Sequence, residues 1–161
     1  MIVSHPSIEI YTDGSCHTQL RLGAWAALIL IKSEEKIILS GKEKNTTHNR
    51  MELTAVIEAI KYVRNNLKSV SSLTIVSDSQ YVVGLTARQE KFTASDFTTK
   101  KGNEIRNVDL VKDLLKYTNS MNIEFVKIKA HQKKTSTINH NIEVDLICRK
   151  IVREAVDELF E

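Results

Sequence analysis

One amphipathic helix between two short strands constrains the fold of this chain more than any other feature. Apolar residues recur at steps of three and four from residue 53 to residue 67, which is the period of a single buried helical stripe. The runs 36–42 and 73–77, on either side of this helix, read as strands. A helix between two strands forms a crossover connection, so we expect the second strand to run parallel to an earlier one.

Three strands are expected before this helix. Residues 8–12 alternate apolar and polar side chains up to Asp13, residues 23–31 are almost continuously apolar, and residues 36–42 form a third run. The links between these runs are short, which favours antiparallel neighbours. Further along the chain, the patterns predict a strand at 123–129, helices at 79–85, 104–118 and 141–160, and a polar, basic connection at 86–103.

Composition narrows the class of protein. The chain has 161 residues, which suits a single domain over residues 1–161, and its net charge of +3 does not by itself indicate a nucleic-acid partner. Cys16 and Cys148 match no zinc-binding or disulfide spacing, so we expect reduced thiols. No secretory leader precedes the first strand, and the apolar run 24–31 is too short to span a bilayer. These features predict a cytoplasmic protein with no membrane partner.

Two carboxylates end the two strands that are expected to be parallel neighbours. Asp13 follows the first strand and Asp78 follows the strand at 73–77. Carboxylates held close together repel each other unless a proton or a cation lies between them. Hard oxygen ligands without a His/Cys cluster favour Mg²⁺ or Mn²⁺ over zinc. The alternative interpretation is that Asp13, followed by Gly14, is a turn residue.

Three more residues are candidates for the same site, and each has an ordinary structural interpretation. Glu52 lies just before the apolar stripe, where it also fits a capping box with Asn49 as the N-cap. Asp145 lies at the start of the last helix, where an acid in the first turn is favourable on its own. His131 follows the strand at 123–129, and beside a carboxylate cluster it is a candidate proton shuttle.

Five motifs, in order and on the expected elements, resemble the cellular type-one class of ribonuclease H over nearly the whole chain. They are Tyr-Thr-Asp-Gly-Ser-Cys (11–16), Thr-Thr-His-Asn-Arg-Met-Glu-Leu (46–53), Ser-Asp-Ser-Gln-Tyr-Val (77–82), Asn-Val-Asp-Leu (107–110) and Val-Lys-Ile-Lys-Ala-His (126–131). The resemblance implies an α/β fold with a five-stranded mixed sheet, in which three antiparallel strands precede two parallel ones and helices flank the sheet.

The resemblance also implies an activity. A member of this family hydrolyses the RNA strand of RNA·DNA hybrids, leaving 3′-hydroxyl and 5′-phosphate ends, and acts as a monomer without an obligate protein partner. The implied metal-binding and catalytic carboxylates are Asp13, Glu52, Asp78 and Asp145. They would hold two divalent ions, Mg²⁺ or Mn²⁺, about 4 Å apart. His131 matches the histidine that assists proton transfer or product departure.

Substrate contacts follow from the same resemblance. Those expected on the RNA strand are Ser15, Cys16, Gln19, Asn49 and Gln80, with His48 at a position that touches a 2′-hydroxyl. Thr47 and Asn107 match positions that grip a DNA phosphate, and Lys100 and Lys101 lie in a basic segment that grips the hybrid. Taken singly, each polar residue of this set also reads as a cap or surface group.

The chain departs from the family pattern at four places. Residues 17–22 contain neither glycine nor proline, and His48 stands where asparagine is common. The basic segment 86–106 has no tryptophan, and the connection from His131 to Asp145 is longer than usual. We therefore expect altered RNA contacts in the 17–22 loop, weaker hybrid binding by the basic segment and a less firmly placed His131.

Three other functions fit parts of the pattern. One is a module that binds hybrids but has lost cleavage. The presence of all four acids argues against it. A second is a DNA-cutting or strand-joining enzyme on the same fold. The motifs at 46–53 and 77–82 favour the hybrid nuclease instead. A third is a small phospho-acceptor domain with a strand-end aspartate and Mg²⁺, which the three initial antiparallel strands disfavour. Fold alone does not decide among them, because function depends on the site.

Overall fold

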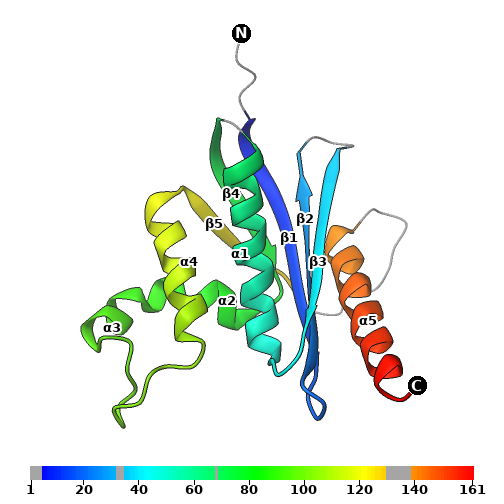
Figure 1. Ribbon diagram of the computed structural model, residues 1–161. Helices are drawn as coiled ribbons and strands as arrows, with labels where there is room; N and C mark the ends of the chain where they lie inside the picture. Colours follow the sequence, from blue (N-terminus) through cyan, green and yellow to red (C-terminus); the bar gives the residue numbers. More distant parts are fainter. Residues whose placement is uncertain (1–4, 32–34, 68, 130–138) are drawn as a thin grey trace.

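The computed structural model describes residues 5–31, 35–67, 69–129 and 139–161 and shows a five-stranded mixed sheet in the order β3-β2-β1-β4-β5 (Figure 1). The strands are β1 (His5–His17), β2 (Leu22–Leu30), β3 (Lys36–Glu43), β4 (Val70–Ser77) and β5 (Ile123–Lys127). β1, β2 and β3 are antiparallel neighbours, whereas β4 runs parallel to β1 and to β5. The mixed α/β architecture predicted from the sequence is therefore confirmed.

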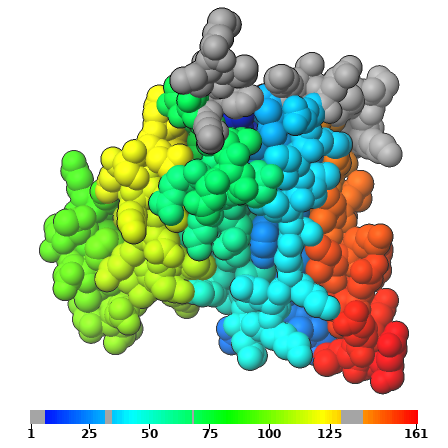
Figure 2. All heavy atoms as spheres, turned by 45° about the horizontal axis from the view of Figure 1, so that its top comes forward, coloured from blue at the N-terminus to red at the C-terminus, as the bar shows by residue number. Residues whose placement is uncertain are grey.

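Helices cover both faces of the sheet. They are α1 (His48–Asn66), α2 (Gln80–Gly84), the 3₁₀ helix η1 (Thr86–Arg88), α3 (Gln89–Ala94), α4 (Val108–Ser120) and α5 (His140–Leu159). α1 and α4 pack side by side on one face, and α5 lies on the opposite face across β1 and β2 (Figures 1 and 2). Within the described ranges, no helix combines the length and apolar character that crossing a bilayer requires.

Strand β2 explains the almost continuous apolar run seen in the sequence. Ala27 and Ile29 join the core beneath α1, whereas Ala26 and Leu28 join the core beneath α5. Successive side chains of a strand point to opposite faces, so a strand that is covered on both faces needs apolar residues at every position. The central strands are therefore held between two cores, which fixes their register.

Strand β1 is longer than the sequence predicted. The expected break at Asp13 is wrong, because β1 continues to His17 and pairs with β2 throughout, with Asp13 opposite Ala26. Its parallel pairing with β4, in contrast, ends at Tyr11 opposite Val76. Asp13 is therefore a strand residue that lies just past the end of its parallel neighbour, and the interpretation of Asp13 as a turn residue does not hold.

Two helix starts also differ from expectation. The N-cap of α1 is Thr47 rather than Asn49, because the Arg50 N–H donates to Thr47 Oγ1 at 3.2 Å. Helix α5 begins at His140, so Asp145 lies in its second turn rather than its first. The connection expected at 86–103 contains the short helices η1 and α3. Glu52 is consequently free of a capping role and available to the sheet edge.

The start of α1 lies unusually close to β1 at Gly14. A Cβ atom on Gly14 would lie 2.4 Å from the backbone nitrogen of Glu52 and 2.5 Å from the carbonyl carbon of Met51. Both are main-chain atoms, which cannot move aside as a side chain can. Gly14 therefore permits the contact that brings Glu52 next to the strand carrying Asp13.

We predict that Gly14→Ala lowers the free energy of unfolding by about 1–3 kcal/mol or more, because the added methyl group forces β1 and α1 apart. Urea denaturation measures the change. The matched control is Gly84→Ala, since a Cβ at Gly84 in α2 would meet only Gln80 Nε2 at 3.6 Å. That variant should be neutral or slightly stabilising. Equal denaturation midpoints for the Gly14→Ala variant and the wild type would contradict the close approach.

Candidate active site

Three carboxylates from three different elements converge at the edge where β4 ends. Asp13 lies on β1, Glu52 in the second turn of α1 and Asp78 directly after β4. One carboxylate oxygen from each lies within 4.8 Å of the other two. Asp13 is 5% exposed and Glu52 is 1% exposed, so the acids are shielded from water that would otherwise screen their repulsion. The structure thus brings together three of the four carboxylates singled out from the sequence.

Among the described residues, the acids of this cluster outnumber the basic groups in contact with them. Burial, together with the charges of Glu52 and Asp78, raises the pKa of Asp13 to about 9. Burial also raises the pKa of Glu52. Neither Glu52 oxygen makes a hydrogen bond of good geometry to the described residues. Buried charges persist in proteins when they are paired or coordinate a metal, so this set of hard oxygen donors fits a divalent cation of the Mg²⁺ class.

His48 is the basic group that the structure places beside the cluster. Its Nε2 lies 3.3 Å from Glu52 Oε1, one helical turn away on α1. Contact with the Glu52 carboxylate raises the pKa of His48. The imidazole is exposed whereas the glutamate is buried, so His48 forms the outer rim of the carboxylate cluster.

Asp145 lies near the other acids but outside the closest group. Its negative charge contributes to the raised pKa of Asp13, while its Oδ2 lies 3.3 Å from Arg149 Nε on the same helix. The helix is tied to the strand below it, because the buried Cys148 thiol donates to the Asp13 carbonyl oxygen at 3.4 Å. The sequence gave no sign of this contact.

The described residues expected to touch substrate, apart from Asn107, fall at four places in the fold. Ser15 and Cys16 continue β1 beyond Asp13, partly buried, and Gln19 is exposed in the turn that follows. Thr47, His48 and Asn49 form the start of α1, and Gln80 begins α2 two residues after Asp78. Lys100 and Lys101 are exposed in the segment between α3 and α4. His131 lies outside the described residues.

Asn107 belongs to a polar network that the sequence did not reveal. It adopts a left-handed backbone conformation, with φ of 59°. Its Nδ2 donates to the Tyr81 hydroxyl at 3.2 Å, and its Oδ1 accepts from Arg50 Nη1 at 3.4 Å. Arg50 also holds Asp109 through two hydrogen bonds of 3.0 and 2.9 Å. The partners lie 57 and 59 residues apart, so no local pattern could have found them.

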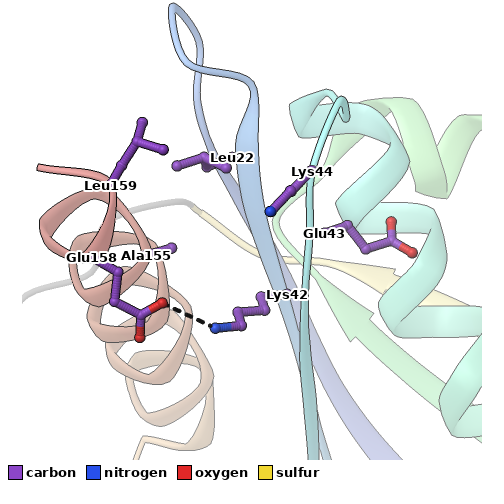
Figure 3. A pocket seen from close by; sticks show the side chains of 7 residues that line it. All are labelled: Leu22, Lys42, Glu43, Lys44, Ala155, Glu158 and Leu159. Atoms are coloured by element: carbon purple, nitrogen blue, oxygen red, sulfur yellow. Dashed lines mark hydrogen bonds and ion pairs between the residues drawn. The ribbon is translucent and has the colours of Figure 1, made fainter.

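A pocket of about 340 Å³ lies elsewhere, between β2, β3 and the last turns of α5 (Figure 3). Lys42 and Glu158 form an ion pair of 3.5 Å on its wall. Its lining residues are Leu22, Lys42, Glu43, Lys44, Ala155, Glu158 and Leu159, none of which is a carboxylate of the cluster. This pocket is therefore separate from the carboxylate cluster.

The fold and the carboxylate cluster agree with comparisons to known proteins. The family model described as RNase H matches residues 5–153. The chain belongs to the RNase H family. The match covers every strand and all three converging acids, so the family accounts for the whole arrangement described above.

Curated relatives share this family over most of their length. A Ribonuclease H from Caldicellulosiruptor saccharolyticus is 34% identical over 154 residues, covering 94% of this chain and 97% of the relative. A Ribonuclease H from a Wolbachia strain of Drosophila simulans is 35% identical over 154 residues, covering 95% of this chain and 100% of the relative. A Ribonuclease H from a Thermoanaerobacter species is 38% identical over 126 residues, covering 77% of this chain and 78% of the relative. This RNase H family chain is accordingly an endoribonuclease.

A solved structure supports the fold. The crystal structure of LC9-RNase H1, described as a type 1 RNase H with the type 2 active-site motif, matches with a TM-score of 0.75 and covers 96% of this chain and 75% of its own. The two sequences are 19% identical. The RNase H fold is therefore retained at a low level of sequence identity.

We predict that Asp13→Asn stabilises the metal-free protein and that the gain grows with pH. Because the folded-state pKa of Asp13 is raised, ionising this group costs stability as pH rises from the usual carboxyl range toward about 9. The asparagine does not ionise, so the variant escapes this loss. The gain should be close to zero near pH 4 and should grow by up to about 1.4 kcal/mol per pH unit until about pH 9, with some 2–4 °C in Tm per kcal/mol.

Thermal unfolding in a chelator, at several pH values, measures this difference. Asp113→Asn is the matched control, because Asp113 is an exposed acid on α4. It should leave the pH dependence of Tm as in the wild type. A constant difference between the Asp13→Asn variant and the wild type across the pH series would refute the electrostatic account.

Proposed function

We propose that the chain is an endonuclease that hydrolyses the RNA strand of RNA·DNA hybrids with two divalent ions, Mg²⁺ or Mn²⁺, and leaves 3′-hydroxyl and 5′-phosphate ends. The observation that carries the proposal is the convergence of Asp13, Glu52 and Asp78 at one sheet edge, with both Glu52 oxygens buried and without hydrogen bonds of good geometry to the described residues. The acids have this arrangement in a chain of the RNase H family.

Each carboxylate has a distinct part in holding the ions. Asp13 and Glu52, the two most buried of these acids, would supply oxygens from β1 and α1, and Asp78 would complete the group from the end of β4. Asp145 becomes the fourth ligand when its carboxylate releases the Arg149 guanidinium and binds a cation instead. When bound, the ions supply the positive charge that activates the attacking water and stabilises the leaving 3′ oxygen. His131 assists proton transfer or product departure.

The residues around the carboxylates select the RNA strand. A 2′-hydroxyl both donates and accepts a hydrogen bond, which distinguishes RNA from DNA at a given position. The RNA strand is contacted by the backbone at Ser15 and Cys16, by Gln19 and by the polar side chains of His48, Asn49 and Gln80. These residues lie on β1, α1 and α2, the elements that carry or follow the three acids, which supports the proposal that the scissile strand crosses the cluster.

A second set of residues holds the DNA strand. Thr47 and Asn107 bind a DNA phosphate, with Asn107 oriented by the Tyr81 hydroxyl and by Arg50. Lys100 and Lys101, in the exposed segment before α4, add sequence-independent electrostatic attraction to the phosphates of the hybrid. The protein acts as a monomer in the cytoplasm, where its two free thiols, Cys16 and Cys148, stay reduced.

We predict cleavage of labelled RNA·DNA hybrid in Mg²⁺ or Mn²⁺, no cleavage in EDTA, and no cutting of double-stranded DNA or double-stranded RNA. Gel analysis of end-labelled strands measures the products and their ends. Asp13→Asn should lower kcat by at least about a thousandfold, because it removes a charged ligand from the metal-binding group. Asp113→Asn, which removes an exposed acid on α4, should cleave like the wild type.

Two results would overturn this function. An absence of hybrid cleavage in both metals, with a folded protein by circular dichroism, would leave only hybrid binding. Equal cutting of hybrid, DNA and RNA duplexes would instead indicate a nuclease that does not recognise the 2′-hydroxyl.

A further inference from the structure

The turn between β1 and β2 is tight and has an arginine at a strained position. Arg21 donates its backbone N–H to the His17 carbonyl oxygen at 2.7 Å, and the Leu20 N–H donates to His17 Nδ1 at 3.1 Å. The φ of Arg21 is +56°, in the left-handed region that glycine and asparagine adopt with less cost. A long, charged side chain retained at such a position calls for an explanation in terms of what the side chain does.

Arg21 fastens this turn to the segment that leads into α1. The Thr46 N–H donates to the Arg21 carbonyl oxygen at 3.1 Å, and Arg21 Nε donates back to the Thr46 carbonyl oxygen at 3.4 Å. The Cys16 thiol lies 3.6 Å from the same carbonyl oxygen. Thr46 is 2% exposed and directly precedes the cap of α1, so the anchor point is rigid. Figure 1 shows the turn and the start of α1 at the same end of the molecule.

The rest of the guanidinium is available to a ligand. Arg21 is exposed, and among the ion pairs of the described residues none involves it. Arg21 Nε and Cys16 Sγ lie 3.4 and 3.6 Å from the same Thr46 carbonyl oxygen, so the guanidinium is close to Cys16. Burial raises the pKa of the Cys16 thiol, and the Arg21 charge opposes that rise. Cys16 lies three residues beyond Asp13 on β1, or about 10 Å along the strand. The positive group is thus near the carboxylates but beyond contact with them.

We propose that Arg21 binds a backbone phosphate of the bound hybrid, and that its anchorage on Thr46 fixes the guanidinium for this contact. The proposal rests on the proposed function and deepens it. Arginine suits the task because its planar fork presents paired donors to phosphate oxygens, and holding Nε in place reduces the entropy lost on binding. A stiff turn with a fixed cation thereby provides a phosphate contact from the segment 17–22, which lacks glycine and proline.

The test measures hybrid binding by fluorescence anisotropy in EDTA over a series of salt concentrations, and steady-state cleavage in Mg²⁺. Arg21→Gln should reduce the slope of log affinity against log salt by about one, as expected for one lost phosphate contact. The KM for hybrid should rise roughly tenfold, since a hydrogen bond to a charged group is lost, and kcat should stay near the wild-type value. A purely structural role would not move the salt slope.

Three companion variants separate binding from folding. Arg21→Gly accepts the positive φ but lacks the guanidinium, so Tm should be kept or raised while the salt slope still falls by about one. Arg21→Lys keeps the charge and should keep most of the slope, with a higher KM than the wild type. Lys116→Gln is the charge-matched control, because it removes one exposed positive charge from α4. The neighbouring residue, Tyr117, contacts Arg64 near the C-terminal end of α1, whereas the Arg21 turn contacts the segment before the N-terminal end of α1.

A wild-type salt slope and KM in the Arg21→Gly and Arg21→Gln variants would overturn this inference while leaving the proposed function intact. An equal loss of slope in the Lys116→Gln variant would also overturn it, because the effect would then reflect net charge alone. Failure of the wild type to cleave hybrid, with the Arg21 dependence of the salt slope preserved, would overturn the proposed function and support the phosphate contact.

Discussion

Repulsion among buried carboxylates is the interaction on which the rest of this structure depends. Asp13 and Glu52 are almost fully enclosed and lie within 4.8 Å of each other and of Asp78, an arrangement that a fold without a cation would disfavour. The surrounding structure opposes the repulsion by close packing. Gly14 lets the backbone of α1 touch β1, and the Cys148 thiol ties α5 to the carbonyl oxygen of Asp13. The elements that hold the acids are therefore also the elements that build the core.

Much of the fold was predictable because the relevant signals are local. The apolar period of α1 and the short links between the first three strands were sufficient for the mixed sheet, and the run in β2 indicated burial on both faces. The convergence of Asp13 and Asp78 was also expected, although partly for the wrong reason. A strand pattern shows that a residue is extended, but it does not show whether the strand continues past an Asp-Gly pair, so β1 was expected to end at Asp13 whereas it continues to His17.

The features that escaped prediction depend on distant residues. Thr47 and Asn49 both suit the cap position, so residue type alone did not decide between them, and the structure has Thr47 as the cap. Arg50 donates hydrogen bonds to Asp109 and Asn107, and Arg21 donates one to Thr46. These bonds join segments that only the tertiary fold brings together. Motif resemblance located the polar residues near the site but could not supply the contacts that orient them.

The early end of β4 leaves a notch in the sheet. From Thr12 onward, β1 has β2 on one side and no parallel partner among the described residues on the other, and the acid cluster opens on this step. The three acids gather where the sheet loses a neighbour, so the length of one short strand decides where on the molecule the chemistry can take place.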